Sequence, residues 1–513
     1  MFDAAISGLG HVFEIQNFLF LFIGVSMGII FGALPGLTAT MGLALLVPFT
    51  FTMSPTSGLI MLAGIYVGAM YGDAIPAILI NTPGTPAAIA TTFDGFPLAQ
   101  KGMAQHGLVA AAIASSYGSL VANIVLATAA PPLAEASLKF GPPEYFWLGI
   151  FGLTIIATLS SGFIIKGLLG GAVGMMLSTV GMAPLGGDVR LTFGYPELQA
   201  GVELIVALIG FFCLPEILSS VIGQRRESYS SEKVVPRLSV IGEVTLSLLK
   251  KPFLMLRSAG IGTVIGFAPG AGGNIASMVS YNEACRWDKH PEDFGKGTIK
   301  GVAASEAANS AMAPGSLIPL LTLGIPGSPP AAVILGALML HGMRPGAELF
   351  SVHAPVTFAF IMGLLVAALL VTVIGTIGSF IYARIINIPA RLLAPAVVFM
   401  TILGSYSIRN NMLDVWIMFL FGVIGYASNK LKFHPAPIVL GLILGPFVEE
   451  GLVQSMLAGG AAGGVLPYMI FRPISAVLIA LCLMSAFWPL FASWRAKRQP
   501  KKDACRTEDE TDA

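Results

Sequence analysis

Gly28-Ile-Ile-Phe-Gly32-Ala-Leu-Pro35-Gly36-Leu-Thr38-Ala-Thr40 is the most informative segment of this chain, because its pattern returns later. It recurs as Gly262-Thr-Val-Ile-Gly266-Phe-Ala-Pro269-Gly270-Ala-Gly272-Gly273-Asn274, with glycines and proline in register at an offset of 234 residues. Proline removes a backbone donor, and glycine tolerates a positive φ. Each stretch therefore predicts an apolar helix that stops and restarts.

A second pair of motifs follows each of these stretches. Its first copy has Gly72, Pro76, Pro83, Gly84, Thr85 and Pro86, which match Gly315, Pro319, Pro326, Gly327, Ser328 and Pro329 at an offset of 243. Chance is the competing explanation, because membrane helices are rich in glycine and proline. So many matches in register favour a true internal repeat, and paired broken helices are typical of secondary transporters.

The composition places the chain in a membrane. Of its 513 residues, 55% are hydrophobic and only 11% are charged, whereas a soluble domain is about 25% charged. Apolar runs long enough to cross a bilayer recur along the chain, and about 20 apolar residues suffice for a helical span. These runs do not alternate as barrel strands do, so helices are expected.

Charge in the loops indicates how the two halves are oriented. The loop between the two motifs is basic in the second half, around residues 286–296, and uncharged in the first, over residues 49–57. Basic loops stay in the cytoplasm, so the halves are expected to be inverted relative to one another. This topology places the N-terminus in the periplasm and the C-terminus in the cytoplasm, with about eleven crossings.

The expected fold class is an all-α polytopic membrane protein with an inverted-topology internal repeat, re-entrant hairpins and discontinuous helices. The expected divisions are a first transmembrane repeat (15–222), a basic cytoplasmic linker (223–251), a second transmembrane repeat (252–494) and a charged cytoplasmic tail (495–513).

The Pro-Gly motifs at 81–86 and 324–329 are expected to be the tips of two re-entrant hairpins. Apolar runs of about a dozen residues flank each tip, which suits half-helices better than full spans. A helix that begins at such a tip offers free N–H groups to an anion; an ordinary extramembrane turn is the alternative. The residues predicted to bind substrate are Asn81, Thr82, Gly84, Thr85, Gly324, Gly327 and Ser328.

The broken helices are expected to bind the coupling cation through backbone carbonyls and neighbouring polar groups. A kink that serves packing alone is the alternative, because Gly28/Gly32 and Gly262/Gly266 form GxxxG pairs. The residues predicted to bind the cation are Gly36, Thr38, Thr40, Asp73, Gly270, Gly273 and Asn274.

Two isolated carboxylates lie in these segments. Asp73 is the one charged residue between positions 15 and 93, and Glu306 is the one between 301 and 343. A carboxylate within the membrane is costly and usually functional, so either could bind Na⁺ or carry a proton. The alternative is that each lies at the water interface. Asp73 aligns with Ser316 in the repeat, so the two halves would contribute differently.

No zinc-protease or nucleotide-binding motif is present: the chain lacks HExxH and a P-loop. Its four cysteines have no CxxC spacing. We therefore expect no enzyme, no cofactor, no metal beyond a possible Na⁺, and no nucleic-acid partner.

At its motifs the chain resembles the large membrane (permease) subunit of the tripartite tricarboxylate transporters. The resemblance rests on Gly32-Ala-Leu-Pro35-Gly36-Leu, Asn81–Pro86, Asp94-Gly95-Phe-Pro97, Gly266–Gly270, Gly324–Pro329 and Leu340–Gly346. It covers essentially residues 15–490.

The resemblance implies a permease of the bacterial inner membrane that works with a small four-helix membrane subunit and a periplasmic solute-binding protein. Its substrate would be a tricarboxylate or related organic anion such as citrate, imported by Na⁺ or H⁺ symport. An anion channel is the alternative function. An intramembrane enzyme is a third, for which no catalytic constellation is found.

Overall fold

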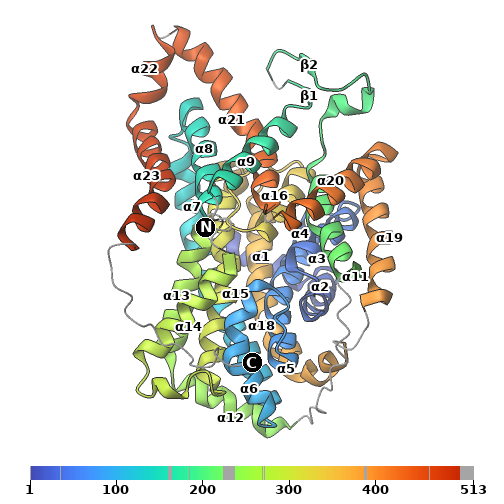
Figure 1. Ribbon diagram of the computed structural model, residues 1–513, viewed down its shortest axis with the longest axis vertical. Coiled ribbons are helices and arrows are strands. Elements are labelled where there is room, and N and C mark those ends of the chain that lie inside the picture. Colours follow the sequence, from blue (N-terminus) through green and yellow to red (C-terminus); the bar gives the residue numbers. More distant parts are fainter. Residues whose placement is uncertain are drawn as a thin grey trace.

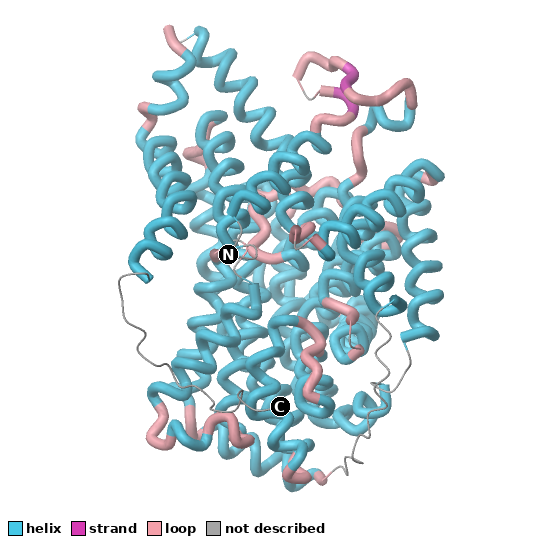
Figure 2. The backbone as a smooth tube through the Cα atoms, in the orientation of Figure 1, coloured by secondary structure: helices cyan, strands magenta, loops and turns pink. Residues whose placement is uncertain are grey.

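The computed structural model of the chain describes residues 2–34, 36–159, 164–183, 185–222, 237–268, 270, 272–385, 390–431, 433–461 and 463–496. Helices dominate these residues, and their two strands, β1 (Gly181–Met182) and β2 (Val189–Arg190), form one antiparallel ribbon with Gly181 opposite Arg190 (Figure 2). The all-α polytopic class expected from the sequence is confirmed.

The described residues of the first half form eleven α-helices and three short 3-10 or π-helical segments. They are α1 (Phe2–Phe13), α2 (Ile15–Ala33), α3 (Ala39–Thr50), α4 (Pro55–Gly72), α5 (Ala74–Ile80), η1 (Pro86–Ala88), α6 (Ile89–Gln100), α7 (Ala104–Ser137), α8 (Pro142–Leu159), α9 (Ile164–Ser178), η2 (Pro196–Ala200), α10 (Leu204–Leu208), η3 (Ile209–Cys213) and α11 (Leu214–Ile222).

The rest of the chain begins at Arg237 among the described residues. Its elements are α12 (Leu238–Leu249), α13 (Pro252–Phe267), α14 (Gly272–Trp287), η4 (Pro291–Asp293), α15 (Ile299–Leu323), α16 (Pro329–Leu340), α17 (Ala347–Ser351), α18 (Ala354–Ile385), α19 (Ala390–Arg409), α20 (Met412–Lys430), α21 (Ala436–Ala461), α22 (Val465–Ile470) and α23 (Pro473–Ala496). Residues 223–236 of the predicted linker and 497–513 of the predicted tail lie outside the described residues.

Six helical stretches are long and apolar enough to cross a membrane within the described ranges. They are Ile15–Ala33, Pro55–Ile80, Ala104–Ser137, Ala354–Gly378, Met412–Lys430 and Ala436–Ala461. Eight shorter apolar helices accompany them. Large apolar side chains such as Leu19, Val264 and Ile377 are exposed on the outside, as a lipid-facing surface requires.

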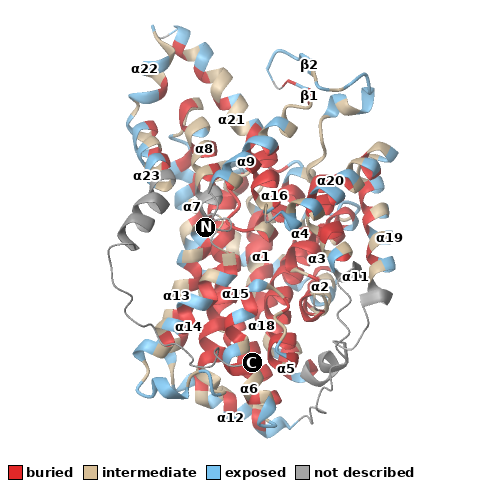
Figure 3. Cartoon of the chain, in the orientation of Figure 1, coloured by how far each residue is buried: buried red, intermediate tan, exposed pale blue. Residues whose placement is uncertain are grey.

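The centre of the molecule is formed by two helices that correspond to one another in the repeat. Every residue of α4 from Ser57 to Gly72 is buried, and so is every residue of α15 from Gly301 to Thr322 (Figure 3). Other helices surround both, so their polar side chains are held inside the protein and away from lipid.

Glycines allow the same close helix contact in both halves. A Cβ on Gly32 of α2 would lie 2.5 Å from the Ala69 carbonyl oxygen of α4. A Cβ on Gly266 of α13 would overlap the carbonyl oxygen of Met312 on α15, which is the counterpart of Ala69 at the 243-residue offset. The GxxxG pairs therefore bring each broken helix against its central helix.

Both broken helices end where the Pro-Gly pairs predict. α2 ends at Ala33 and α3 begins at Ala39, while α13 ends at Phe267 and α14 begins at Gly272. The glycines of the two pairs adopt left-handed backbone angles, with φ of 89° at Gly36 and 82° at Gly270. These angles are the reason for glycine at both positions.

Each tip segment turns back along the helix that precedes it. Asn81 and Gly324 end the helices in the left-handed region, with φ of 52° and 74°. The N–H groups of Thr82 and Gly84 then donate to the carbonyls of Pro76 and Asp73, at 3.3 Å each. In the second half Ile325 and Gly327 donate to Pro319 and Ser316 at the same distances.

The expectation of a half-helix on both sides of each tip is wrong for the preceding side. The helices after the tips, α6 and α16, have 12 residues each, but the helices before them span 26 residues (Pro55–Ile80) and 25 residues (α15). α15 contains many small residues, chiefly Ala and Ser, together with Glu306 and Asn309, so its strongly apolar run is short. Burial among other helices lets such residues remain helical, and neighbours compensate for interior prolines.

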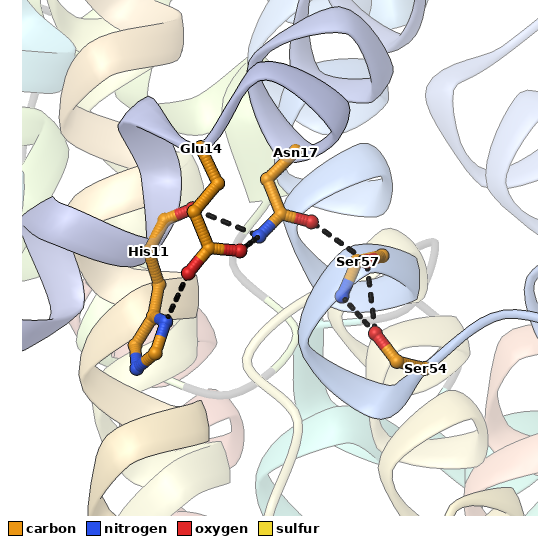
Figure 4. Close-up of polar contacts among 5 residues, drawn as sticks. All are labelled: His11, Glu14, Asn17, Ser54 and Ser57. Carbon is orange, nitrogen blue, oxygen red and sulfur yellow. Dashed lines mark hydrogen bonds and ion pairs between the residues drawn. The ribbon is translucent and has the colours of Figure 1, made fainter.

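A polar cluster attaches the N-terminal helices to the start of α4 (Figure 4). The amide of Asn17 donates to the His11 carbonyl at 2.8 Å and to the Glu14 carboxylate at 3.0 Å. Ser57 donates its hydroxyl hydrogen to Asn17 Oδ1 at 2.6 Å and is itself linked to Ser54 at 2.8 Å. This contact fixes α2 beside α4 at one end of the bundle.

Candidate functional site

The first tip lies beside Asp73, at the junction of α4 and α5. Gly84 is buried against α2 and α4, and a Cβ on it would lie 2.6 Å from the Gly32 carbonyl oxygen and 2.8 Å from the Asp73 Cα. Thr85 donates its hydroxyl hydrogen to Asp73 Oδ2 at 2.6 Å. Tip and broken helix of the first half thus meet at a buried carboxylate.

The second tip repeats this arrangement around a neutral residue. A Cβ on Gly327 would lie 2.5 Å from the Gly266 carbonyl oxygen and 2.9 Å from Ser316 Cα. Gly270 donates its N–H to the Gly327 carbonyl at 2.9 Å, and the Ser328 hydroxyl bonds to Ser316 at 3.1 Å. Ser316 and Ser328 are the counterparts of Asp73 and Thr85, so the two sites share a geometry but differ in charge.

One residue from each half reaches the tip of the other half. The Tyr66 hydroxyl on α4 bonds to Ser316 at 3.1 Å and to Ser328 at 3.0 Å. The Asn309 amide on α15 donates to Asp73 Oδ1 at 3.3 Å and to the Met70 carbonyl at 3.3 Å. Tyr66 and Asn309 are themselves counterparts at the offset of 243 residues, so the contact between the halves is reciprocal.

An unpaired oxygen marks the first site. Asn309 is fully buried, and its Oδ1 has no hydrogen-bond partner among the described residues. A Cβ on Gly273 would lie 2.5 Å from this oxygen and 2.8 Å from the Ala87 Cβ, so the start of α14 lies beside the first tip. A buried acceptor without a donor indicates a missing ligand or water, and a cation would suit the oxygen atoms present.

The structure brings together some of the sequence-predicted residues and separates others. Gly84, Thr85, Asp73 and Gly273 converge on the first site, while Gly270, Gly327 and Ser328 converge on the second. Asn81 is exposed at the far end of α5, and Gly324 occupies the matching end of α15.

The polar residues beyond the helix breaks have local roles. The Thr38 side chain accepts a hydrogen bond from the Met41 N–H at 3.2 Å and so caps α3, whereas Thr40 is buried within that helix. Asn274 lies in the first turn of α14. Thr82 bonds through its hydroxyl to the Ile80 carbonyl at 3.3 Å.

The side chains that form hydrogen bonds with Asp73 and Glu306 are neutral. Within the described ranges, no lysine, arginine or histidine nitrogen forms an ion pair with Asp73 or Glu306. The same residues contain no group of three His, Cys, Asp or Glu side chains placed to hold a metal ion. The first site therefore combines one carboxylate with neutral oxygens.

Residues of the Asp94-Gly95 motif attach the first hairpin to the second half. Asp94 Oδ1 accepts the N–H groups of Gly297 and Thr298 at 2.8 and 2.9 Å. Its Oδ2 accepts the Tyr281 hydroxyl hydrogen at 2.9 Å. Lys101, just beyond α6, donates to the Lys296 carbonyl at 2.5 Å. The end of the first hairpin thus lies on the loop between α14 and α15.

The corresponding loops pair at the other end of the bundle. His341, just beyond α16, has its ring centroid 6.4 Å from that of Phe51, which follows α3. In Figure 1 the β1–β2 ribbon lies at the upper end, and α12 and the α14–α15 loop lie at the lower end.

A cavity of about 480 Å³ opens near the ribbon, between α9, α16 and α21. Its walls include Glu203, Met339, Leu442 and Glu449 but neither tip. Glu449 is paired with Arg190 at 2.7 Å and Glu203 with Arg409 at 2.5 Å, so this cavity offers no free charge of its own.

Comparison with known proteins identifies the family of the chain. The model of the tripartite tricarboxylate transporter TctA family matches residues 18–440. The chain belongs to this family. The range includes both broken helices, both tips and both central helices, so the paired sites are part of the TctA region, and the resemblance expected from the motifs is confirmed.

Two relatives of the chain come from Agrobacterium vitis. One, called "Uncharacterized 52.8 kDa protein in TAR-I ttuC' 3'region", is 38% identical over 487 residues, which cover 94% of this chain and 95% of the relative. The other, called "Uncharacterized protein in TAR-II ttuC' 3'region", is 37% identical over 237 residues, 46% of this chain and 97% of the relative. No solved structure matches the chain.

Sequence reasoning did not find Tyr66 and Asn309. Both are neutral, and neither belongs to a Gly/Pro motif. The repeat itself could have identified them. At the 243-residue offset Tyr66 pairs with Asn309, and the two residues lie about two helical turns before Asp73 and Ser316 respectively.

Proposed function

We propose that this chain is the permease subunit of a tripartite secondary transporter that imports a tricarboxylate or related organic anion, such as citrate, by cation symport. A periplasmic solute-binding protein delivers the anion, and a small four-helix membrane subunit completes the complex. The proposal rests on the two equivalent tip sites, of which the first has a carboxylate and the second a hydroxyl group at the matching position. The reciprocal contacts of Tyr66 and Asn309 join these sites.

The site at the first tip binds the coupling cation. Asp73 supplies the negative charge, and Thr85 and the unpaired Asn309 Oδ1 supply neutral oxygens. Gly273 allows the backbone of the second broken helix to approach the same place. A bound cation would satisfy the Asn309 oxygen and neutralise a carboxylate that no basic side chain pairs among the described residues.

The site at the second tip binds the anion. Ser316, Ser328 and Tyr66 offer three hydroxyl groups and no carboxylate. The 12-residue helix α16 begins directly after Ser328, so the positive end of its dipole faces the tip, although Pro329 and Pro330 have no N–H and the Ala331 N–H donates to the Ser328 hydroxyl oxygen at 3.4 Å. A substrate carboxylate at the first tip would instead meet Asp73. We therefore assign Thr85 to the cation and Ser328 to the substrate.

The contacts between loops support inverted repeats. The end of the first hairpin lies on the loop between α14 and α15, whereas the end of the second hairpin lies by Phe51, beyond α3. Each hairpin end thus meets the inter-helix loop of the other half, as two oppositely inserted halves require. The segment around the α14–α15 loop carries Arg286, Lys289, Lys296 and Lys300, whereas residues 49–57 carry no Lys or Arg, so this end belongs in the cytoplasm and the N-terminus in the periplasm of the inner membrane.

The test is transport by the complete system in proteoliposomes. The chain would be reconstituted with the membrane subunit and the binding protein encoded beside it, and labelled citrate uptake followed under Na⁺ or pH gradients. Symport predicts accumulation above the external concentration, which an ionophore abolishes. Uptake that stops at equal concentrations would instead identify an anion channel. The absence of citrate counterflow would refute transport of this substrate.

A further inference from the structure

Arg257 carries a charge that neither tip site uses. It lies on α13, five residues after that helix begins at Pro252. An arginine near the end of a membrane helix usually extends its charged group to water. The Nε and Nη1 atoms of Arg257 are instead enclosed, and they have no hydrogen-bond partner among the described residues. A guanidinium in such a place needs an acceptor, which indicates that an anion binds here.

Two exposed aromatic rings cover this guanidinium. Its Cζ lies 5.6 Å from the ring centroid of Phe253 and 5.9 Å from that of Trp287, the last residue of α14. These residues are 69% and 67% exposed. Because both rings face outward, an anionic group at the outer surface of the bundle can displace them and reach the charge. Exposed tryptophans are typical of the membrane–water interface, so we expect this place to lie at the depth of the lipid headgroups.

The acidic side chains of the neighbouring segment already have partners. Glu283 accepts the indole N–H of Trp287 at 2.9 Å and is paired with Arg286 at 3.5 Å. Asp288 is paired with Lys300 at 2.7 Å. No carboxylate forms an ion pair with Arg257 within the described ranges. The acceptor therefore comes from outside this part of the chain.

The helix before α13 also faces outward with apolar side chains. α12 lies at the lower end of the bundle (Figure 1), and one of its faces packs against α7. Leu246 and Leu249 on another face are 56% and 68% exposed, and Lys250 follows them at the surface. The acidic residue of α12, Glu243, lies 4.0 Å from His106. Outward leucines beside a basic residue are typical of a helix at the membrane surface, where basic side chains attract anionic lipids.

We propose that Arg257 binds the phosphate of an anionic phospholipid between Phe253 and Trp287. The guanidinium donates hydrogen bonds to the phosphate oxygens, a pairing that its planar geometry favours. The acyl chains lie along the outer side of α13, where Leu256 and Val264 are 53% and 71% exposed. This apolar surface is the reason for assigning a lipid, because a soluble phosphate would gain nothing from it. The inference goes beyond the proposed function, since lipid binding requires neither citrate nor a coupling cation.

The test measures lipid binding to the purified full chain in a neutral detergent by native mass spectrometry. The probe is phosphatidylglycerol, with zwitterionic phosphatidylcholine and water-soluble glycerol phosphate as comparisons. Wild-type protein should retain phosphatidylglycerol in preference to both. Arg257→Met keeps an apolar side chain of similar length and should lower the affinity for phosphatidylglycerol about ten- to hundredfold, the value of one hydrogen bond to a charged group.

Lys289→Met is the matched control. Lys289 is exposed on the loop that follows α14, so its replacement removes one positive charge from the same end of the molecule. This variant should bind phosphatidylglycerol as the wild type does. An unchanged affinity in Arg257→Met, or an equal loss in Lys289→Met, would overturn the inference, because a diffuse basic surface would then attract the lipid.

The comparisons separate the other possible occupants. Glycerol phosphate bound as tightly as phosphatidylglycerol would identify a soluble anion and overturn the assignment to a lipid. Loss of the lipid when the small membrane subunit is added would show that a protein surface covers Arg257 instead. None of these readouts depends on citrate transport, so absence of transport would refute the proposed function alone.

A second measurement applies if Arg257→Met does not fold. A photoreactive phosphatidylglycerol in vesicles that contain the wild-type chain should label residues 249–257 and 283–289 more heavily than α19, which also exposes apolar side chains such as Phe399. Equal or weaker labelling of these two segments would also overturn the inference.

Discussion

Replacement of Asp73 by Asn should weaken cation dependence far more than substrate recognition. Asp73 is the charged member of the first site, and its described neighbours Thr85 and Asn309 are neutral. Asn at this position preserves the shape and removes the negative charge. Removal of one member of a buried ion pair costs about 3–5 kcal/mol, and each 1.4 kcal/mol is a factor of ten. The apparent affinity for the coupling cation should therefore fall by about two to three and a half orders of magnitude.

The assay is citrate uptake into proteoliposomes at a series of Na⁺ concentrations at fixed pH, and at a series of pH values without Na⁺. Citrate counterflow at saturating cation gives the substrate constant separately, and Glu243→Gln is the control for a lost carboxylate. The reasoning is refuted if Asp73→Asn leaves both cation titrations unchanged, or if the loss lies wholly in the citrate constant.

The remaining predictions concern the second tip, the close glycine contacts and the loop between α14 and α15. Ser316→Ala, at the position equivalent to Asp73, should leave the cation titration unchanged and weaken citrate binding by about two- to tenfold, the value of one hydrogen bond; a shifted cation titration would contradict the assignment. Gly84→Leu and Gly327→Leu should abolish uptake while the protein still inserts, because each side chain would meet backbone atoms within 2.6 Å, whereas Gly260→Leu, with no atom within 4 Å of its Cβ, should transport normally. Normal uptake by both tip variants would reject the role of the tips. Asp94→Ala removes the acceptor of Gly297 and Thr298, so amide exchange in residues 294–300 should accelerate at least about tenfold; unchanged exchange would show that this contact does not hold the loop.

The repeat made much of the fold predictable from the sequence. Pro-Gly pairs have direct backbone consequences, so the helix ends at Ala33 and Phe267 follow from local chemistry. The lengths of the helices before the tips were not predicted correctly, because half-helices were inferred there from the length of an apolar run. In α15 the polar residues Ser305, Asn309 and Ser316 are buried by surrounding helices, and their environment depends on contacts far away in sequence.

The composition of the candidate site was partly predictable for the same reason. Asp73 stood out as a lone charge, and Gly84 and Gly327 stood out in the motifs. Tyr66 and Asn309 did not, since their partners belong to the opposite half and lie more than 230 residues away. Only the packing of the two central helices brings these side chains to the tips.

Electron cryomicroscopy of the complex with citrate and Na⁺ would show directly whether the two tips bind the anion and the cation separately. We expect an anion against Ser316, Ser328 and Tyr66 and a cation against Asp73 and Asn309. Both tips should be enclosed by helices at the depth of the bilayer. Tips that project into bulk water, or citrate bound in the cavity beside Glu203 and Glu449 with both tip sites empty, would contradict the proposal.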